Sequence, residues 1–438
     1  MDEVRSLVEA QLAVARDRNP ELRALIRTLD PPAAGDGPLH GLTVSVKDNI
    51  DVAGVPTTAG SAHLGTEPAA VDAEVVRRLR AAGALITAKA NLAEFAMGVV
   101  GRNAAFGDVR NARDPRCISG GSSSGSAVAV ASGMSTAALG TDTGGSGRVP
   151  ASVNGIVGLR PTLGRVSNQG VLPVGESFDT VTPLTADVAT AAAMLAVLSS
   201  DGPTVDSLLG QDIAGLRVGV ATGFFRARVD PGVQRVVDGV VAALRSAGAV
   251  VRDVEVPGAA EAQDRMIEIM YPEAAAVHAR RLREESDTID PDVLRRLRIG
   301  QSIPPETSAR ARAWQRDFRD RVDALFEDCD VVLTPTIPVD VPRRDAVDLA
   351  ASTQEIARFC YVWSCYGGPS ISVPAGDHPG SGLPVGVQLS AAPWREDRLL
   401  WAAARLSEHT LSGTGGGGGS SATRSPEAGA GHRCSRRP

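Results

Sequence analysis

The chain has few cysteines and few histidines, and their spacing limits what the protein can be. Its five cysteines include no Cys-x-x-Cys pair, so the sequence supports neither a disulfide framework nor a zinc knuckle. Its six histidines are scattered, without the spacing of metal ligands. The sequence therefore predicts no metal site and no bound cofactor.

Long apolar runs and a basic excess are also lacking. The first 30 residues mix acids and bases in an amphipathic pattern, without the apolar stretch of about 7 to 15 residues that marks a signal peptide. The apolar runs at 127–130 and 191–197 are too short or too interrupted to span a bilayer. A net charge of -6 gives no overall attraction for nucleic acid or anionic lipid. We therefore expect a cytoplasmic protein that binds neither.

Lysine is almost absent from the sequence. Only Lys47 and Lys89 are lysines among the 45 Lys and Arg residues. A lysine can lose its proton when burial removes it from water, whereas an arginine in a protein stays charged. Two interpretations stay open at this point: a drift toward arginine left two lysines by chance, or lysine is kept where a neutral amine is needed.

The remaining composition is that of a globular protein, with 43% hydrophobic and 22% charged residues in a chain of 438. Segments that alternate like strands recur among segments with helical spacing. We expect strands at 42–47, 84–88, 216–220, 250–256, 330–333, 370–373 and 385–389, helices at 73–82 and 233–247, and two helices within 3–28 that Pro20 separates. The pattern predicts an α/β fold, with a mixed central sheet covered by helices.

The chain is expected to form one large domain at residues 1–411. Within it, residues 258–328 are charged and mostly helical in pattern, which favours an insertion that lies over the sheet. Residues 412–438 are rich in Gly, Ser and Arg and have no apolar periodicity, so they are predicted to be a disordered tail.

Residues 119–150 read SGGSSSGSAVAVASGMSTAALGTDTGGSGRVP. This density of Gly and Ser would let backbone N–H groups converge on a phosphate or on a developing oxyanion. Neither lysine lies here and Gly-x-Gly-x-x-Gly is missing, so a nucleotide-binding loop is not supported. Residues 121–125 do fit the Gly-x-Ser-x-Gly elbow around Ser123, which leaves a serine–histidine hydrolase as a remote alternative. No strand is predicted before that elbow, although the motif requires one.

Five stretches of the chain resemble the amidase signature family over roughly residues 1 to 410. They are GGSSSGSAVAVASG, ALGTDTGGSGRVPASVNGIVGLRPT, GLTVSVKDNIDVAGVPTTAGS, DVVLTPTIP and GLPVGVQLSA. The resemblance implies the amidase signature fold and an enzyme that hydrolyses a non-peptide amide C–N bond through an acyl-enzyme. The family's Ser-Ser-Lys triad falls on Ser146 as nucleophile, Ser122 as bridging serine and Lys47 as base.

The resemblance also implies supporting residues. A cis peptide bond is expected before Ser122. The oxyanion would be bound by the backbone N–H groups of Thr143, Gly144, Gly145 and Ser146. Ser123 is expected to hydrogen-bond near Lys47, Asp142 and Arg148 to brace the nucleophile loop as a buried pair, and Lys89 to be structural.

The chemistry of lysine agrees with this assignment. An unperturbed lysine has a pKa of about 10.4, so only about 1 in 2,500 would be neutral at pH 7. Burial among small neutral groups favours the neutral amine and lowers the pKa by several units. Asp48 follows Lys47 directly and should point to the other side of the strand end, because successive side chains of a strand alternate.

Several functions fit the same residues. The A subunit of the tRNA-dependent Asp/Glu amidotransferase uses the same triad on glutamine, and only that alternative would bring a nucleic acid as partner. Gly147 stands where most relatives carry an apolar residue, which resembles the allophanate-hydrolase branch. Otherwise the expected partner is a small amide substrate, with a homodimer possible. Six large residues could line one substrate pocket: Phe95, Met97, Phe178, Tyr361, Trp363 and Tyr366.

Overall fold

The structure is a computed structural model that describes residues 2–31, 34–62, 64, 66–199, 213–346 and 348–413. Its strands form one sheet of 11 strands in the order β1-β3-β2-β4-β6-β5-β10-β11-β9-β7-β8. The strands are β1 Leu25–Thr28, β2 Thr43–Lys47, β3 Leu85–Ala90, β4 Ala137–Asp142, β5 Val157–Arg160, β6 Thr180–Thr185, β7 Arg217–Ala221, β8 Val250–Val254, β9 Val331–Pro335, β10 Ser370–Asp377 and β11 Pro384–Ser390. β2 is parallel to β3 and β4, and β7 is parallel to β8 and β9, while the other pairs are antiparallel. The predicted mixed α/β sheet is confirmed.

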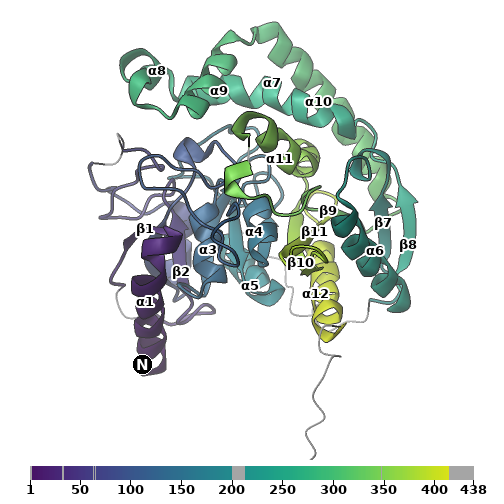
Figure 1. Cartoon of the computed structure of the whole chain (residues 1–438), viewed down its shortest axis with the longest axis horizontal. Helices are drawn as coiled ribbons and strands as arrows, with labels where there is room; N and C mark the ends of the chain where they lie inside the picture. Colours follow the sequence, from purple (N-terminus) through teal and green to yellow (C-terminus); the bar gives the residue numbers. More distant parts are fainter. Residues whose placement is uncertain are drawn as a thin grey trace, which may run out of the picture.

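Helices cover both faces of the sheet (Figure 1). α2, α5, α12 and α6 contact one another in a row on one face, and α3 and α4 pack on the other face beneath α11. The α-helices are α1 Asp2–Leu22, α2 Glu74–Ala81, α3 Ser124–Ala131, α4 Arg148–Asn154, α5 Val188–Leu198, α6 Pro231–Ser246, α7 Ala259–Val277, α8 Ala279–Glu284, α9 Pro291–Ser302, α10 Pro305–Phe326, α11 Leu349–Tyr366 and α12 Glu396–Gly413. The largest apolar core lies under the α2–α5–α12–α6 row.

The alternation of side chains along β2 determines the face of the sheet to which Lys47 points. Val44 and Val46 are fully buried in the largest core, and side chains in between point to the opposite face of a sheet. On that opposite face, Ser45 contacts Ser135 just beyond α3, and Lys47 contacts Ser122 just before it. The local pattern TVSVK therefore directs Lys47 toward the glycine- and serine-rich segment.

α3 is built from small residues because it lies close to the backbone of neighbouring segments. A Cβ at Gly125 would approach the Ala24 carbonyl oxygen to 2.1 Å and the Asn91 nitrogen to 2.5 Å. A glycine inside a helix costs about 1 kcal/mol relative to alanine, so its presence here reflects this close packing. The helix thereby holds Ser122 and Ser123, which precede it, against the sheet.

Two predictions about the N-terminal region were wrong. α1 continues through Pro20 in its last turn, and the expected second helix is strand β1. Asn19 explains the exit from the helix, since its side chain bonds both the Leu25 N–H and the Leu25 carbonyl. Pairing of β1 with β3 then overrides the helical spacing of Leu22, Leu25 and Ile26.

Residues 258–328 form helices α7 to α10 and the short 3-10 turn Ser286–Thr288. Figure 1 shows α7, α9 and α10 as an arch beyond α11. These helices pack mainly against one another, and outside the segment α7 and α10 pack against α11, so the segment covers that helix. At the other end, α12 extends to Gly413, and residues 414–438 of the predicted tail lie outside the described residues. In the part of the chain that the structure describes, no helix is long and apolar enough to cross a membrane.

Candidate active site

Lys47 lies fully buried at the end of β2 and contacts two hydroxyl groups. Its Nζ is 2.7 Å from Ser122 Oγ and 2.7 Å from Thr141 Oγ1. The peptide bond between Gly121 and Ser122 is cis, as the family resemblance implied. The structure therefore brings together the predicted base and the predicted bridging serine, and it adds Thr141 of β4, which the sequence analysis missed.

Burial lowers the pKa of Lys47 from 10.5 to about 7, although the negative charges of Asp179 and Asp142 act to raise it. A substantial fraction of the amine is then neutral near pH 7 and can accept a proton. Asp48 does not oppose this effect. It forms a buried ion pair with Lys89, with 2.9 Å between Nζ and Oδ1.

Lys89 has the structural surroundings that were expected of it. Besides Asp48, its Nζ donates to the Ile50 carbonyl at 2.6 Å and to Thr57 Oγ1 at 3.3 Å. Burial lowers the pKa of Lys89, while the Asp48 charge acts in the opposite direction. The two lysines are thus both buried, and among the described residues a carboxylate is in direct contact with Lys89 but not with Lys47.

Ser146 begins the turn into α4 and is 7% exposed. Its carbonyl accepts a hydrogen bond of 3.1 Å from the Ser123 N–H, which joins the two serine-containing segments. A small cavity of about 30 Å³ adjoins Ser146, and its walls include Thr143, Val174 and Tyr361. Ser146, the predicted nucleophile, therefore lines a cavity.

Three of the four expected oxyanion donors keep their N–H groups unused. The Gly145 N–H donates to Asp142 Oδ1 at 2.7 Å, so it already has a partner within the protein, and its role as a donor to the substrate stays a prediction. Among the described residues, no partner is found for the N–H groups of Thr143, Gly144 and Ser146. Gly144 lies so close to the ring of Tyr361 that a Cβ there would be 2.8 Å from it, so only glycine fits.

Asp142 and Arg148 form a fully buried ion pair beneath this loop. Arg148 Nε donates to Asp142 Oδ2 at 2.9 Å and its NH2 donates to Oδ1 at 3.0 Å. Burial alone would raise the pKa of Asp142, but the Arg148 and Arg160 guanidinium groups hold it well below its usual range. Arg148 also reaches Gln388 of β11 and Ser364 of α11. The loop that carries the predicted nucleophile is thus attached to two distant elements.

Ser123 acts one step away from Lys47. Its Oγ donates to the Thr141 carbonyl at 3.0 Å and accepts from the Thr141 N–H at 3.1 Å, so it fixes the residue that contacts Lys47. The described histidine rings are engaged elsewhere. His40 bonds Gly35, His278 stacks on Phe95 with centroids 4.1 Å apart, and His378 bonds Asp230. This arrangement gives no support to the serine–histidine alternative centred on Ser123.

Only part of the expected large-residue pocket exists. Met97 and Tyr361 line the Ser146 cavity. Phe95 and Phe178 are buried in the same apolar cluster, whereas Trp363 and Tyr366 belong to another one, built with Phe225 and Phe318. The prediction failed for Trp363 and Tyr366 because residues close in sequence on α11 point to different sides of the helix.

Gly147 lies too close to β6 to carry a side chain. A Cβ at this position would approach Thr182 Cγ2 of β6 to 2.4 Å. The glycine after the predicted nucleophile therefore leaves room for a β-branched residue on strand β6. The allophanate-hydrolase-like alternative that this glycine suggested stays a prediction.

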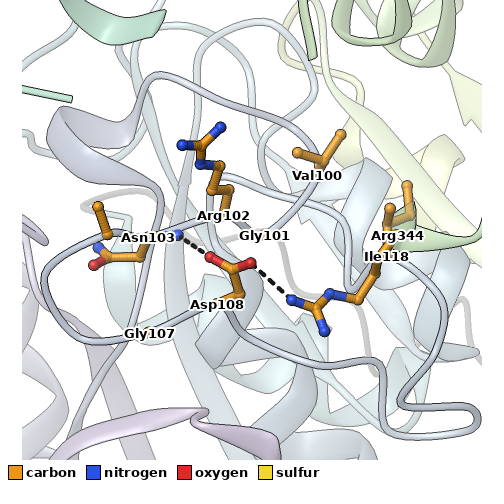
Figure 2. A pocket seen from close by; sticks show the side chains of 9 residues that line it. Val100, Gly101, Arg102, Asn103, Gly107, Asp108, Ile118 and Arg344 are labelled. Atoms are coloured by element: carbon orange, nitrogen blue, oxygen red, sulfur yellow. Dashed lines mark hydrogen bonds and ion pairs between the residues drawn. The ribbon is translucent and has the colours of Figure 1, made fainter. Parts of the chain in front are cut away.

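A second, larger pocket lies near the site but outside it. Figure 2 shows it between Arg102, Asp108 and Arg344, with a volume of about 560 Å³. Asp108 is already occupied there, because it accepts from the Asn103 N–H and from Arg344. This pocket contains none of the predicted catalytic residues.

Besides Thr141, the sequence analysis missed Asp179 and Arg160. Asp179 Oδ1 accepts from Thr143 Oγ1 at 2.6 Å, and Arg160 contacts the Asp142 carbonyl. Thr141 lies within the recognised motif and could have been found by its place on the strand beside β2. Asp179 stands in no motif or periodic pattern that would have marked it.

Comparison with known proteins agrees with this geometry. A family model described as Amidase matches residues 4–400. The chain is 35% identical over 390 residues to AtzE, the 1-carboxybiuret hydrolase subunit of Pseudomonas sp. (strain ADP), covering 83% of this chain and 82% of that protein. It is 36% identical over 407 residues to the A subunit of the glutamyl-tRNA(Gln) amidotransferase of Akkermansia muciniphila, covering 83% and 85%. A crystal structure of an amidase superposes with a TM-score of 0.84 at 33% identity, covering 92% and 95%.

The chain therefore belongs to the amidase family, the amidase signature enzymes. The single large α/β domain is the fold of those solved relatives. The relatives include both hydrolases and the A subunit of an amidotransferase, which is part of a complex.

Proposed function

We propose that the protein hydrolyses the C–N bond of a small carboxamide, with Ser146 as nucleophile and Lys47 as the base that acts through Ser122. The observation that carries this proposal is the buried contact of 2.7 Å between Lys47 Nζ and Ser122 Oγ. A lysine surrounded by hydroxyl groups and shielded from water is suited to accept a proton, and this environment lowers its pKa to about 7.

In the first half of the reaction, Ser146 Oγ attacks the amide carbonyl carbon. The Ser146 proton passes to Ser122 Oγ, and the Ser122 proton passes to Lys47 Nζ. When the tetrahedral intermediate collapses, the C–N bond breaks, and the same relay returns a proton to the leaving nitrogen. The acyl group stays on Ser146. A water molecule then attacks this ester and gives a proton to the relay. As the acyl C–O bond breaks, the relay returns that proton to Ser146 Oγ, which releases a carboxylic acid and restores Ser146 and neutral Lys47.

The intermediate's negative oxygen would be bound by the N–H groups of Thr143, Gly144 and Ser146. Fixed donors of this kind are typically worth about 3 to 4 kcal/mol each in the transition state. Asp142 supports the loop by accepting from the Gly145 and Gly147 N–H groups, so the loop does not have to reorganise during the reaction.

The Ser146 cavity suggests which substrates fit. Its volume of about 30 Å³ is small, and Arg296 of α9 contributes a positive charge to its wall. We propose that the preferred substrate is a short amide that carries a carboxylate. The name of the relative that acts on 1-carboxybiuret supports this class. Arg296 also binds Asp292 and the Met97 carbonyl, so a substrate carboxylate would share its donors.

A second candidate function is release of ammonia from glutamine as the A subunit of an amidotransferase. The 36% identity with such a protein over most of both chains favours it. Glutamine is itself a short amide with a carboxylate, so the same site would serve. Under this candidate the protein works with partner subunits and a tRNA, whereas a free-standing amidase needs only its substrate; a homodimer and a cytoplasmic location stay predictions for either.

The acyl-enzyme can be tested directly. The purified chain should hydrolyse at least one member of a panel of glutamine, a short carboxylated amide and its neutral counterpart. A serine-reactive fluorophosphonate should then label the tryptic peptide 117–148, which contains both Ser122 and Ser146, and fragmentation should place the label on Ser146. The Ser146→Ala variant should be inactive and unlabelled. Full activity of Ser146→Ala, or a label on Ser122, would show that the proposed nucleophile is wrong.

A further inference from the structure

Asp179 is a buried carboxylate directly before β6 that has no place in the proton relay. Its Oδ1 accepts from Thr143 Oγ1 at 2.6 Å. Its Oδ2 accepts from the backbone N–H groups of Val174 at 2.8 Å and Gly175 at 3.1 Å. One side chain therefore connects the loop that follows β4 with the loop that precedes β6.

Both connected loops face the reacting serine. Thr143 and Val174 line the cavity that adjoins Ser146. The Thr143 N–H is also one of the three remaining donors for an oxyanion. Loss of the Asp179 contacts would free the two walls of the cavity from each other and would release the Thr143 side chain.

Asp179 also contributes charge to the site. Its carboxylate raises the pKa of Lys47 on β2 more than any other acid does, ahead of Asp142 on β4. The charged groups of the neighbouring elements are Arg148 on α4 and Arg160 on β5, and Arg160 NH2 donates to the Phe178 carbonyl at 2.9 Å. On the outer side, Glu273 of α7 and Arg312 of α10 hold the 174–178 loop at Ser177 as an ion pair.

We propose that Asp179 is a positioning residue for amide hydrolysis, which fixes the oxyanion loop against the 174–178 loop and places a negative charge that acts on Lys47. The inference rests on the proposed function. Asp179 acts through Thr143 and Lys47 and does not itself transfer a proton to the substrate.

The charge has a measurable consequence. Burial raises the pKa of Asp179 to about 6, so the carboxylate is mostly ionised at pH 7 and above. When its charge is removed, protonated Lys47 loses a favourable neighbour, and Lys47 gives up its proton at lower pH. Neutralisation of Asp179 should therefore extend activity toward acid, in contrast to a purely structural defect.

The test compares Asp179→Asn with Thr143→Val. Asparagine has the same shape, and its oxygen can face the Val174 and Gly175 N–H groups while its amide donates to Thr143 Oγ1. We expect the acid limb of kcat/KM to move to lower pH by several tenths of a unit in Asp179→Asn. Thr143→Val keeps the charge, so its limb should stay in place while kcat falls about tenfold.

An unmoved acid limb in a folded Asp179→Asn protein would overturn the proposal. If that variant does not fold, Thr143→Val decides alone, because wild-type kcat there would also contradict the positioning role. Fluorophosphonate labelling of Ser146 in both variants separates this failure from failure of the proposed function. A wild-type protein that is not labelled at Ser146 refutes the mechanism itself, whereas labelled variants with unchanged kinetics refute only the role of Asp179.

Discussion

At the scale of single residues, the two lysines of the chain show how environment sets chemical role. Lys89 lies 2.9 Å from Asp48 in an ion pair, whereas the hydrogen-bond partners of Lys47 among the described residues are two hydroxyl groups. A buried amine without a paired carboxylate favours its neutral form. The rarity of lysine in the sequence indicated two candidates, and their contacts distinguish the proposed base from the lysine that is held in an ion pair.

These two lysines provide a matched pair of variants. Lys47→Arg keeps the charge but cannot act as a base at neutral pH, so kcat should fall at least about a hundredfold. Lys89→Arg can keep its ion pair with Asp48, and its kcat should stay within a few-fold of the wild type. Steady-state kinetics on both folded proteins measures the difference, and equal losses would contradict the assignment of Lys47.

A relay that contains no imidazole would be expected to give an activity that rises with pH as its base loses a proton, without a limb near the histidine pKa of about 6.5. A pKa of about 7 for Lys47 instead places the limb close to that value. The position of the limb alone therefore does not distinguish lysine from histidine. Loss of the limb in Lys47→Arg does distinguish lysine from histidine, because the described histidines lie outside the site.

At the scale of helices and strands, prediction from the sequence succeeded where the pattern was local. The strand that ends at Lys47 and the strands at 84–88 and 216–220 are present, because period-two alternation or a short apolar run is visible within about five residues. The prediction of two N-terminal helices failed because β1 forms by pairing with β3, which is distant in the sequence. Thr141 lies within the family motif and could have been predicted. Asp179 follows a loop, and no local sequence pattern predicts where that loop runs.

Glu273 of α7 is one of the links between the outer helices and the site. Glu273 of α7 accepts from the Ser177 hydroxyl at 2.6 Å and its N–H at 3.2 Å, and Arg312 of α10 binds both. Glu273→Ala should loosen the 174–178 loop and raise KM several-fold, because Val174 lines the cavity. Hydrogen exchange of the loop amides should become faster.

Glu268 on the same helix is the control for this prediction. It pairs with Arg265 through its side chain at 3.0 Å, close to the helix surface and away from the 174–178 loop. Glu268→Ala should leave KM and loop exchange unchanged. Equal effects of the two substitutions would mean that α7 as a whole, and not the Ser177 contact, holds the loop.

For the whole molecule, a buried neutral lysine makes stability depend on pH. The folded-state pKa of Lys47 is lowered to about 7, so between pH 7 and 10.5 the unfolded chain binds more protons than the folded one. Stability from this group therefore rises with pH across that window, at about 1.4 kcal/mol per unit. Below pH 7 the cost of keeping the amine buried is fully present.

Lys47→Met removes this cost and keeps the length of the side chain. From pH 7 to pH 9, the unfolding free energy of the wild type should rise by about 2 kcal/mol relative to that of Lys47→Met. Urea titrations at both pH values measure it. A difference that does not change with pH would show that Lys47 remains protonated in the folded protein.

The order of strands in the sheet sets an order for assembly during synthesis. β1 to β6 form one end of the sheet and β7 to β9 the other, and only the hairpin of β10 and β11, made late, joins β5 to β9. Until that hairpin leaves the ribosome, β5 and β9 are two open edges that can pair with other nascent chains. Gln388 of β11 is also a partner of Arg148, so the strand that closes the sheet completes the support of the nucleophile loop. A chain that stops before residue 370 would lack both.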